Sequence, residues 1–205
     1  VATYGFDQIV RALELYGKGK ETAEVIKAIT GRSVAEFDAD FKGYLGGRLR
    51  AYDGTFRLPQ PGSEDLTALE IAVDAKPKDV TTRARLAVGY YWAGDADKAA
   101  MAAKATLDLD PDQPWALYVM AEVELRGQFA DLAREHYQRL IDLGHDSFDV
   151  RIHLAQIAQL RGEVNVMIGH LCAAKRLDPE RSLPYAQLGE IYKDAGRTDD
   201  YLKEM

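Results

Sequence analysis

A repeat of about 34 residues is the feature that most constrains what this chain can fold into. Gly94, Gly162 and Gly196 lie 68 and 34 residues apart, and Pro77 and Pro111 are also 34 residues apart. The stretches between these residues each carry two helical patterns of apolar residues. A single helix pair of this size cannot bury its apolar faces, so successive pairs stack into a solenoid. The chain is therefore predicted to be all-α, a right-handed superhelical array of helix pairs.

The period divides the C-terminal part of the chain, residues 63–205, into one single helix and four units. Ser63 is expected to cap the single helix. Gly127 lies one residue before the place that the period predicts, so we expect a turn one residue longer there. The predicted elements are a capping helix at 63–76, full repeats at 80–113, 114–147 and 148–181, and a partial repeat at 182–205, whose second helix starts near Thr198.

Residue types recur at fixed places within these units. The first unit has Leu86, Ala87 and Tyr90, then Gly at the turn, and ends in Asp-Pro; the last has Leu188 and Gly189 at the matching places. Small residues allow two antiparallel helices to approach, and large residues fill the space between units. The pattern resembles the tetratricopeptide repeat. This resemblance implies a concave face, lined by the first helix of each unit, that holds a peptide or helix of a partner protein.

Candidate binding residues are the first-helix positions that the repeat core does not use. Aromatic anchors often dominate the energy of interfaces, although the aromatic members could equally pack between helices. Ala84 and Val88 stand where arrays that bind chaperone carboxylates carry Lys and Asn, which argues against that activity. The predicted groove residues are Tyr91, Trp92, Tyr118, Glu122, Gln156, Gln159, Glu190 and Lys193.

Residues 1–50 form a separate predicted region of three short helices, followed by a linker at 51–62 that is rich in Pro and Gly. Phe56 and Leu58 are apolar, so the linker is expected to pack as an extended strap. Gly31 is expected to end the second helix, and Ser33 with Glu36 to form a capping box for the third. The order of these helices, with Tyr4-Gly5 and Tyr16-Gly17, resembles the C-terminal helical end of gluzincin-type zinc metallopeptidase domains. That resemblance implies a bacterial enzyme whose H-E-x-x-H helix lies upstream of residue 1.

Composition and motifs indicate no catalytic chemistry in these residues. The net charge of −7 argues against a general nucleic-acid surface. No nucleophile motif, phosphate loop or His/Cys cluster is present, so no cofactor or metal is predicted. His153 shares a helix face with Gln156 but forms no ligand set, and Cys172 is expected to pack between helices. The sequence indicates no compartment.

Three functional hypotheses remain open from the sequence. The first is a non-catalytic protein-interaction module that binds a partner in the groove. The second is the C-terminal part of a zinc metallopeptidase, and the third is a module that associates with itself.

Overall fold

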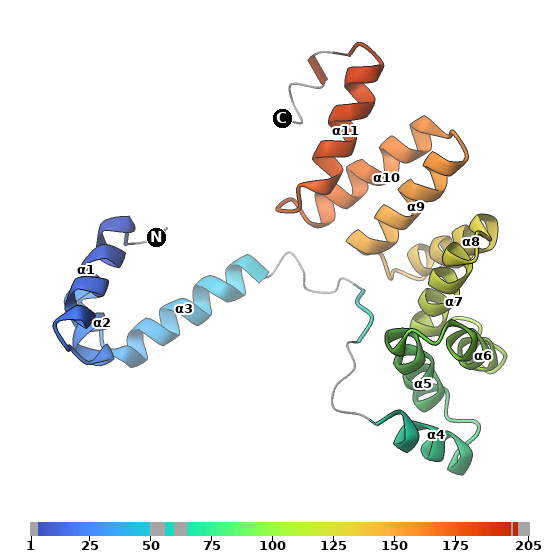
Figure 1. Cartoon of the computed structure of the whole chain (residues 1–205), viewed down its shortest axis with the longest axis horizontal. Coiled ribbons are helices and arrows are strands. Elements are labelled where there is room, and N and C mark those ends of the chain that lie inside the picture. The colour runs from blue at the N-terminus through green and yellow to red at the C-terminus, as the bar shows by residue number, and fades with distance from the viewer. Residues whose placement is uncertain (1–3, 50–55, 60–64, 198, 201–205) are drawn as a thin grey trace. The chain divides into compact units, whose positions relative to one another are not determined.

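The computed structural model describes residues 4–49, 56–59, 65–197 and 199–200. Within these ranges it contains eleven α-helices and no strand, which confirms the all-α prediction (Figure 1). The chain divides into two compact units, Val1–Asp53 and Gly54–Met205. Each unit is described by itself below.

The N-terminal unit consists of α1 (Phe6–Gly17), α2 (Thr22–Thr30) and α3 (Val34–Leu49). The end of α2 and the start of α3 are as predicted. Gly31 ends α2 with a left-handed φ of 73°. The backbone N–H of Ser33 donates to Glu36 Oε2 over 2.8 Å, and the N–H of Glu36 donates to Ser33 Oγ over 3.3 Å. This reciprocal pair confirms the capping box.

Little of this unit is buried. Val25 of α2 is the one fully buried apolar side chain among its described residues. Phe6 and Leu13 of α1 are 67% and 66% exposed, and Phe41 of α3 is 51% exposed. Burial of apolar area is the main favourable term in folding, so this unit has only a small core of its own.

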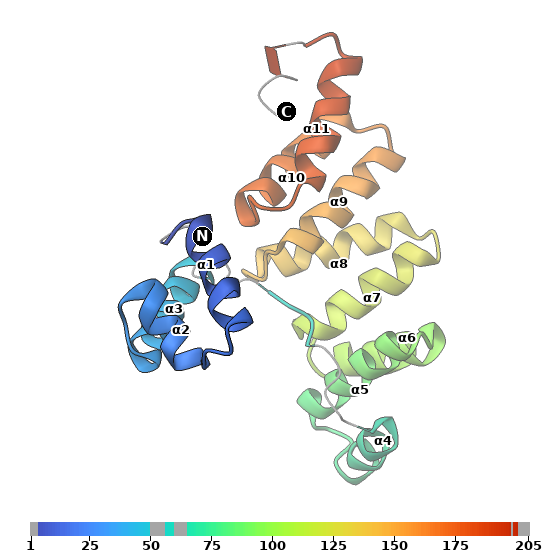
Figure 2. The same cartoon turned by 60° about the vertical axis from the view of Figure 1, so that its left-hand side comes forward.

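The C-terminal unit is a succession of stacked helices (Figures 1 and 2). The helices are α4 (Leu66–Ala75), α5 (Val80–Ala93), α6 (Ala96–Leu107), α7 (Pro114–Arg126), α8 (Ala130–Asp142), α9 (Phe148–Leu160), α10 (Val164–Leu177) and α11 (Leu183–Asp194). Helices α5, α7 and α9 pack against α6, α8 and α10, and each of these second helices also contacts the first helix of the next unit.

The single helix at the start of the array is shorter than the predicted 63–76. It begins at Leu66, because the side chain of Asp65 accepts the N–H of Thr67 over 3.0 Å and so caps it. Ser63, the predicted cap, lies outside the described residues. Helix α4 packs so closely on α5 that a Cβ built on Gly89 would lie 2.6 Å from Leu66 Cδ2.

The turn between α7 and α8 is one residue longer than its counterpart, as predicted. Residues 127–129 separate α7 from α8, whereas only residues 94–95 separate α5 from α6, and the second helices still start 34 residues apart, at Ala96 and Ala130. Gln128, not Gly127, takes the left-handed conformation, with φ 65° where Gly94 has φ 79° in the first pair. Gly127 has φ −76° and lies against the ring of Phe129. The period is thus kept at the cost of a non-glycine residue with positive φ.

Small residues recur where the two helices of a pair meet. Ala87, Ala121 and Ala155 are 34 residues apart and at most 1% exposed, and Gly189 continues the series as a buried residue of α11. Around them lie three clusters of buried apolar side chains, and Leu107 and Trp115 contact two of these clusters. The predicted helix from Thr198 to Met205 lies almost entirely outside the described residues.

Candidate functional site

A buried carboxylate lies at the centre of the candidate site. Glu122 projects from α7 and is only 6% exposed. Its Oε1 accepts hydrogen bonds from the hydroxyl of Tyr137 over 2.7 Å and from Nε2 of His153 over 2.8 Å. Its Oε2 accepts from the hydroxyl of Tyr91 over 3.1 Å. Both oxygens of the buried anion are therefore satisfied by neutral or positive donors.

The donors come from three successive helix pairs: Tyr91 from α5, Tyr137 from α8 and His153 from α9. The position of Tyr137 explains why a carboxylate is needed. The equivalent residues 34 positions away, Ala103 and Leu171, are as completely buried as Tyr137 but have no polar group. A hydroxyl introduced at this buried position requires an acceptor, and Glu122 supplies it.

The network holds Glu122 ionised. Burial favours the neutral acid, but the hydrogen bond and charge of His153 and the tyrosine hydroxyls outweigh it and lower the pKa of Glu122 to about 2. For His153, burial likewise favours the neutral ring, yet the Glu122 carboxylate raises the pKa of the imidazole above its usual value. Burial and the Glu122 charge also raise the pKa of Tyr91 to about 12. Below the usual pKa of histidine, the site thus contains an ion pair surrounded by neutral phenols.

This geometry suits positioning rather than proton transfer. A general base needs a pKa near the working pH and a lone pair that faces its substrate. Glu122 has a strongly lowered pKa, and its oxygens already face three donors. We conclude that the carboxylate fixes the orientation of the aromatic side chains around it.

Those aromatic side chains pack against one another in two groups, which the hydrogen bonds of Glu122 connect. The rings of Tyr137 and His153 stack, with centroids 5.3 Å apart and an interplanar angle of 13°. The Tyr118 ring packs edge-on against Tyr137, at 5.9 Å, and is 9% exposed. Tyr91 packs edge-on against Trp92 at 5.2 Å. We call the surface made by Tyr91, Trp92, Tyr118, Glu122 and His153 the first-helix face.

Cations lie at the edge of this face. The guanidinium of Arg126 lies 4.9 Å from the centre of the Tyr91 ring, and its Nη2 donates to the Tyr91 hydroxyl over 3.2 Å. The same Nη2 lies 3.7 Å from Glu122 Oε2. Arg126 therefore covers the rim of the network, where it is more exposed than the imidazole of His153.

A short irregular segment, Phe56–Pro59, lies on the first-helix face beside α7 (Figure 2). The Phe56 ring packs 5.7 Å from that of Tyr118, and its backbone N–H donates to the carbonyl of Asp146 over 3.3 Å. At the other end, Trp92 Nε1 donates to the carbonyl of Pro59 over 3.0 Å. Residues predicted as linker thus belong to the structure around the predicted groove.

The predicted groove residues fall into two sets. The structure brings together Tyr91, Trp92, Tyr118 and Glu122, and Gln156 joins them through a 3.3 Å contact between its Oε1 and His153 Nδ1. Gln159, Glu190 and Lys193 are exposed on α9 and α11, away from this network. Of the other first-helix positions considered, Ala84 and Val88 are buried between helices.

Two members of the site, Tyr137 and His153, are absent from the predicted groove residues. For Tyr137, comparison of the units at a spacing of 34 gives a signal, because an aromatic residue with a hydroxyl replaces Ala and Leu. His153 likewise has Arg85, Val119 and Gln187 as its equivalents. Phe56 lies outside the repeats, but its apolar character and that of Leu58 predict packing as an extended strap, which the structure confirms.

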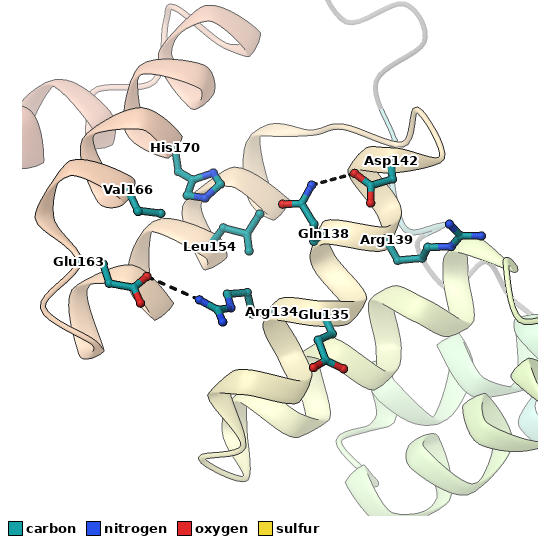
Figure 3. A pocket seen from close by; sticks show the side chains of 9 residues that line it. All are labelled: Arg134, Glu135, Gln138, Arg139, Asp142, Leu154, Glu163, Val166 and His170. Carbon is teal, nitrogen blue, oxygen red and sulfur yellow. Dashed lines mark hydrogen bonds and ion pairs between the residues drawn. The ribbon is translucent and has the colours of Figure 1, made fainter.

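A cavity opens on the second-helix side of the array (Figure 3). It measures about 510 Å³ and lies between α8 and α10, above Leu154 of α9. Several of its polar side chains are already paired: Arg134 with Glu163 at 3.6 Å, Gln138 with Asp142 at 2.9 Å, and Arg139 with Asp112 at 2.7 Å. Such paired groups offer little to a ligand, so this cavity is a weaker candidate than the first-helix face.

Metal sites and membrane-spanning helices are absent from the part of the chain that the structure describes. Among these residues, no group of three or more His, Cys, Asp or Glu side chains is placed so that it could hold a metal ion. None of the described helices combines the length and the apolar character needed to cross a bilayer. Cys172 is half-buried against the cluster around α10.

Comparison with solved structures identifies the architecture. A crystal structure of YrrB, described as a TPR protein with an unusual peptide-binding site, superimposes with a TM-score of 0.62 over 68% of this chain and 72% of that one, at 16% identity. The array has the tetratricopeptide-repeat fold. A crystal structure of MamA superimposes with a TM-score of 0.61 over 68% of this chain and 81% of that one, at 22% identity. The structure of MamA from Desulfovibrio magneticus RS-1 superimposes with a TM-score of 0.57 over 68% of this chain and 77% of that one, at 19% identity.

The tetratricopeptide-repeat fold predicted from the 34-residue period is therefore confirmed. No protein-family model matches the chain, and no curated protein matches it significantly. The identities to the tetratricopeptide-repeat structures are too low to transfer a partner or activity. None of the comparisons supports the resemblance of residues 1–50 to a zinc metallopeptidase.

Proposed function

We propose that this chain is a protein-interaction module that binds an extended segment of a partner protein on its first-helix face. The observation that carries the proposal is the environment of Trp92. Its side chain is 45% exposed beside Tyr91, and its indole N–H already binds a backbone carbonyl of an irregular segment. A backbone carbonyl is present in every peptide, so this contact can be made by a partner of unrelated sequence.

The fixed orientation of the aromatic side chains beside Trp92 supports the same proposal. Binding costs conformational entropy when side chains must first be ordered, and a preorganised surface reduces that cost. The hydrogen bonds of Glu122 hold Tyr91 and Tyr137 in one orientation before any partner arrives. Aromatic residues on such a rigid surface are favoured as interaction hot spots.

The proposal is tested by selecting peptides from a random display library against the full chain and measuring their affinity for purified variants. We expect Trp92→Ala to weaken binding by about tenfold or more, as truncation of a hot-spot residue does. Met101→Ala is the matched control, because Met101 is 72% exposed on α6, a second helix. The Tyr118→Ala change is avoided, since Tyr118 is buried and its loss would disturb folding.

Two results would contradict the proposal. One is binding that Trp92→Ala leaves unchanged. The other is a set of NMR shift changes, caused by the bound peptide, that fall on α6, α8 and α10 instead of α5, α7 and α9.

A further inference from the structure

The Phe56–Pro59 segment contacts the first-helix face in the way that a bound peptide would. Its side chains alternate: Phe56 is 9% exposed, Arg57 is exposed and Leu58 is half-buried. Phe56 packs into one buried cluster of the array, and Leu58 packs against that cluster and the next one. Alternation between a contacting and a solvent-facing side chain is typical of an extended ligand.

Main-chain hydrogen bonds hold the segment at both ends. The N–H of Phe56 donates to the Asp146 carbonyl, which lies between α8 and α9, and the Pro59 carbonyl accepts from Trp92 at the end of α5. The segment therefore runs from the loop before α9, past Tyr118 of α7, to the end of α5. Within the segment, the two side-chain anchors are an aromatic ring and a Leu, separated by one residue.

We infer that Phe56–Pro59 is an internal ligand of the first-helix face, and that partner segments carry the same pattern: an aromatic residue, any residue, Leu and Pro. This inference rests on the proposed function and names the class of partner. A partner binds by displacing Phe56–Pro59, since the Phe56 ring and the Leu58 side chain already occupy the positions that its anchors require.

Covalent attachment gives the internal segment an advantage that can be predicted. Residues 60–64 connect Pro59 to Asp65, the cap of α4. A short linker of this kind gives an effective concentration on the order of millimolar. Against a peptide that binds in the range of 10 to 100 μM, this competition weakens the apparent affinity by roughly 10- to 100-fold.

The experiment uses the full chain and a fluorescein-labelled peptide, Gly-Ser-Phe-Arg-Leu-Pro-Gly-Ser, which carries the sequence of residues 56–59. Fluorescence polarisation is measured with wild type, with the Phe56→Ala/Leu58→Ala variant and with Leu58→Ala alone. We expect the double variant to bind the peptide roughly 10- to 100-fold more tightly than wild type, with the single variant in between. A control peptide with Ala in place of Phe and Leu should not bind.

A measurement on wild type avoids any effect of the substitutions on folding. At millimolar peptide, the backbone amide resonance of Phe56, assigned by selective ¹⁵N-Phe labelling and comparison with Phe56→Leu, should shift because displacement of the segment breaks its hydrogen bond to the Asp146 carbonyl. The inference is overturned if this resonance does not move. It is equally overturned if the double variant keeps its helical circular dichroism and binds the peptide no more tightly than wild type.

The outcomes separate this inference from the proposed function. Library-selected peptides that depend on Trp92, and that bind wild type and the double variant equally, would overturn the internal-ligand assignment while the first-helix face remained a binding site. If selected peptides bind but are insensitive to Trp92→Ala, both the proposed function and the internal-ligand inference are overturned.

Discussion

At the scale of single residues, the most unusual feature of the array is the backbone of Gln128. It has a positive φ of 65° at the place where three other turns use Gly. A left-handed conformation costs a residue with a Cβ about 1–2 kcal/mol. Because Gln128 is exposed, the cost comes from its backbone and is not offset by packing of its side chain.

We therefore expect Gln128→Gly to stabilise the protein by about 0.5–1 kcal/mol, after allowance for the greater freedom of Gly in the unfolded chain. Urea denaturation followed by circular dichroism measures this change. Gln128→Ala is the matched control, since it removes the same side-chain atoms but keeps the Cβ. Equal stability of the Gly and Ala variants would show that the turn is not strained.

The ion pair of Glu122 and His153 predicts a specific dependence of stability on pH. The lowered pKa of Glu122 means that its contribution is complete above pH 4.5 and is lost as the pH falls towards about 2. The raised pKa of His153 means that its contribution is complete below pH 6.5 and is lost as the pH rises through the folded value. The pair thus stabilises most between pH 4.5 and 6.5.

The test is the difference in free energy of unfolding between wild type and His153→Gln from pH 5 to 8. We expect this difference to shrink as the pH rises above 6.5. For comparison, the lowered pKa of Glu122 corresponds to a stabilisation of its ionised form by roughly 3 kcal/mol. Tyr137→Phe removes a hydrogen bond to the same oxygen without a group that titrates in this range. The free energy of unfolding lost through Tyr137→Phe should therefore not change with pH. A loss for His153→Gln that is equally independent of pH would argue against the charged pair.

At the scale of helices, the sequence predicted most of what the structure contains because helix pairs are local. The stop at Gly31 and the capping box of Ser33 and Glu36 are signals within one turn, and each is where the sequence placed it. The site could be predicted only in part. Glu122 binds side chains 15 and 31 residues away, so its partners depend on how three pairs stack.

The close approach of helices at the small-residue positions gives a prediction at this scale. Ala121 of α7 is completely buried in a cluster with Ala133 of α8. Leu at this position would have to push the two helices apart, and overpacking of this kind typically costs about 1–3 kcal/mol. We expect Ala121→Leu to lower the midpoint of urea denaturation. Ala186→Leu is the control, because Ala186 is exposed on a first helix of the same array; a similar loss in both variants would show that the tight position is misassigned.

At the scale of the whole molecule, the two units differ in how much apolar surface they bury. The described part of the N-terminal unit has one fully buried apolar side chain, Val25, whereas the array contains three buried clusters. Local stability follows the density of buried contacts. The array should therefore be the more stable of the two units.

Hydrogen exchange followed by mass spectrometry tests this difference in the intact chain. Amides of α1 and α3 should exchange well before those of α7 and α9, because their helices open at lower free energy. Backbone amides of α10 serve as an internal reference for a helix in the array. Equal protection of α1 and α7 would contradict the prediction.

The carboxylate of Glu122 also limits how this array can change over generations. A solenoid ordinarily gains or loses whole units by duplication and deletion, since each unit contacts only its neighbours. Here one anion draws its donors from three consecutive units. Excision of the first or the third unit would remove a donor to this buried charge, and excision of the second would remove the acceptor of Tyr91 and His153. We therefore expect these three units to be inherited as a block while the ends of the array vary.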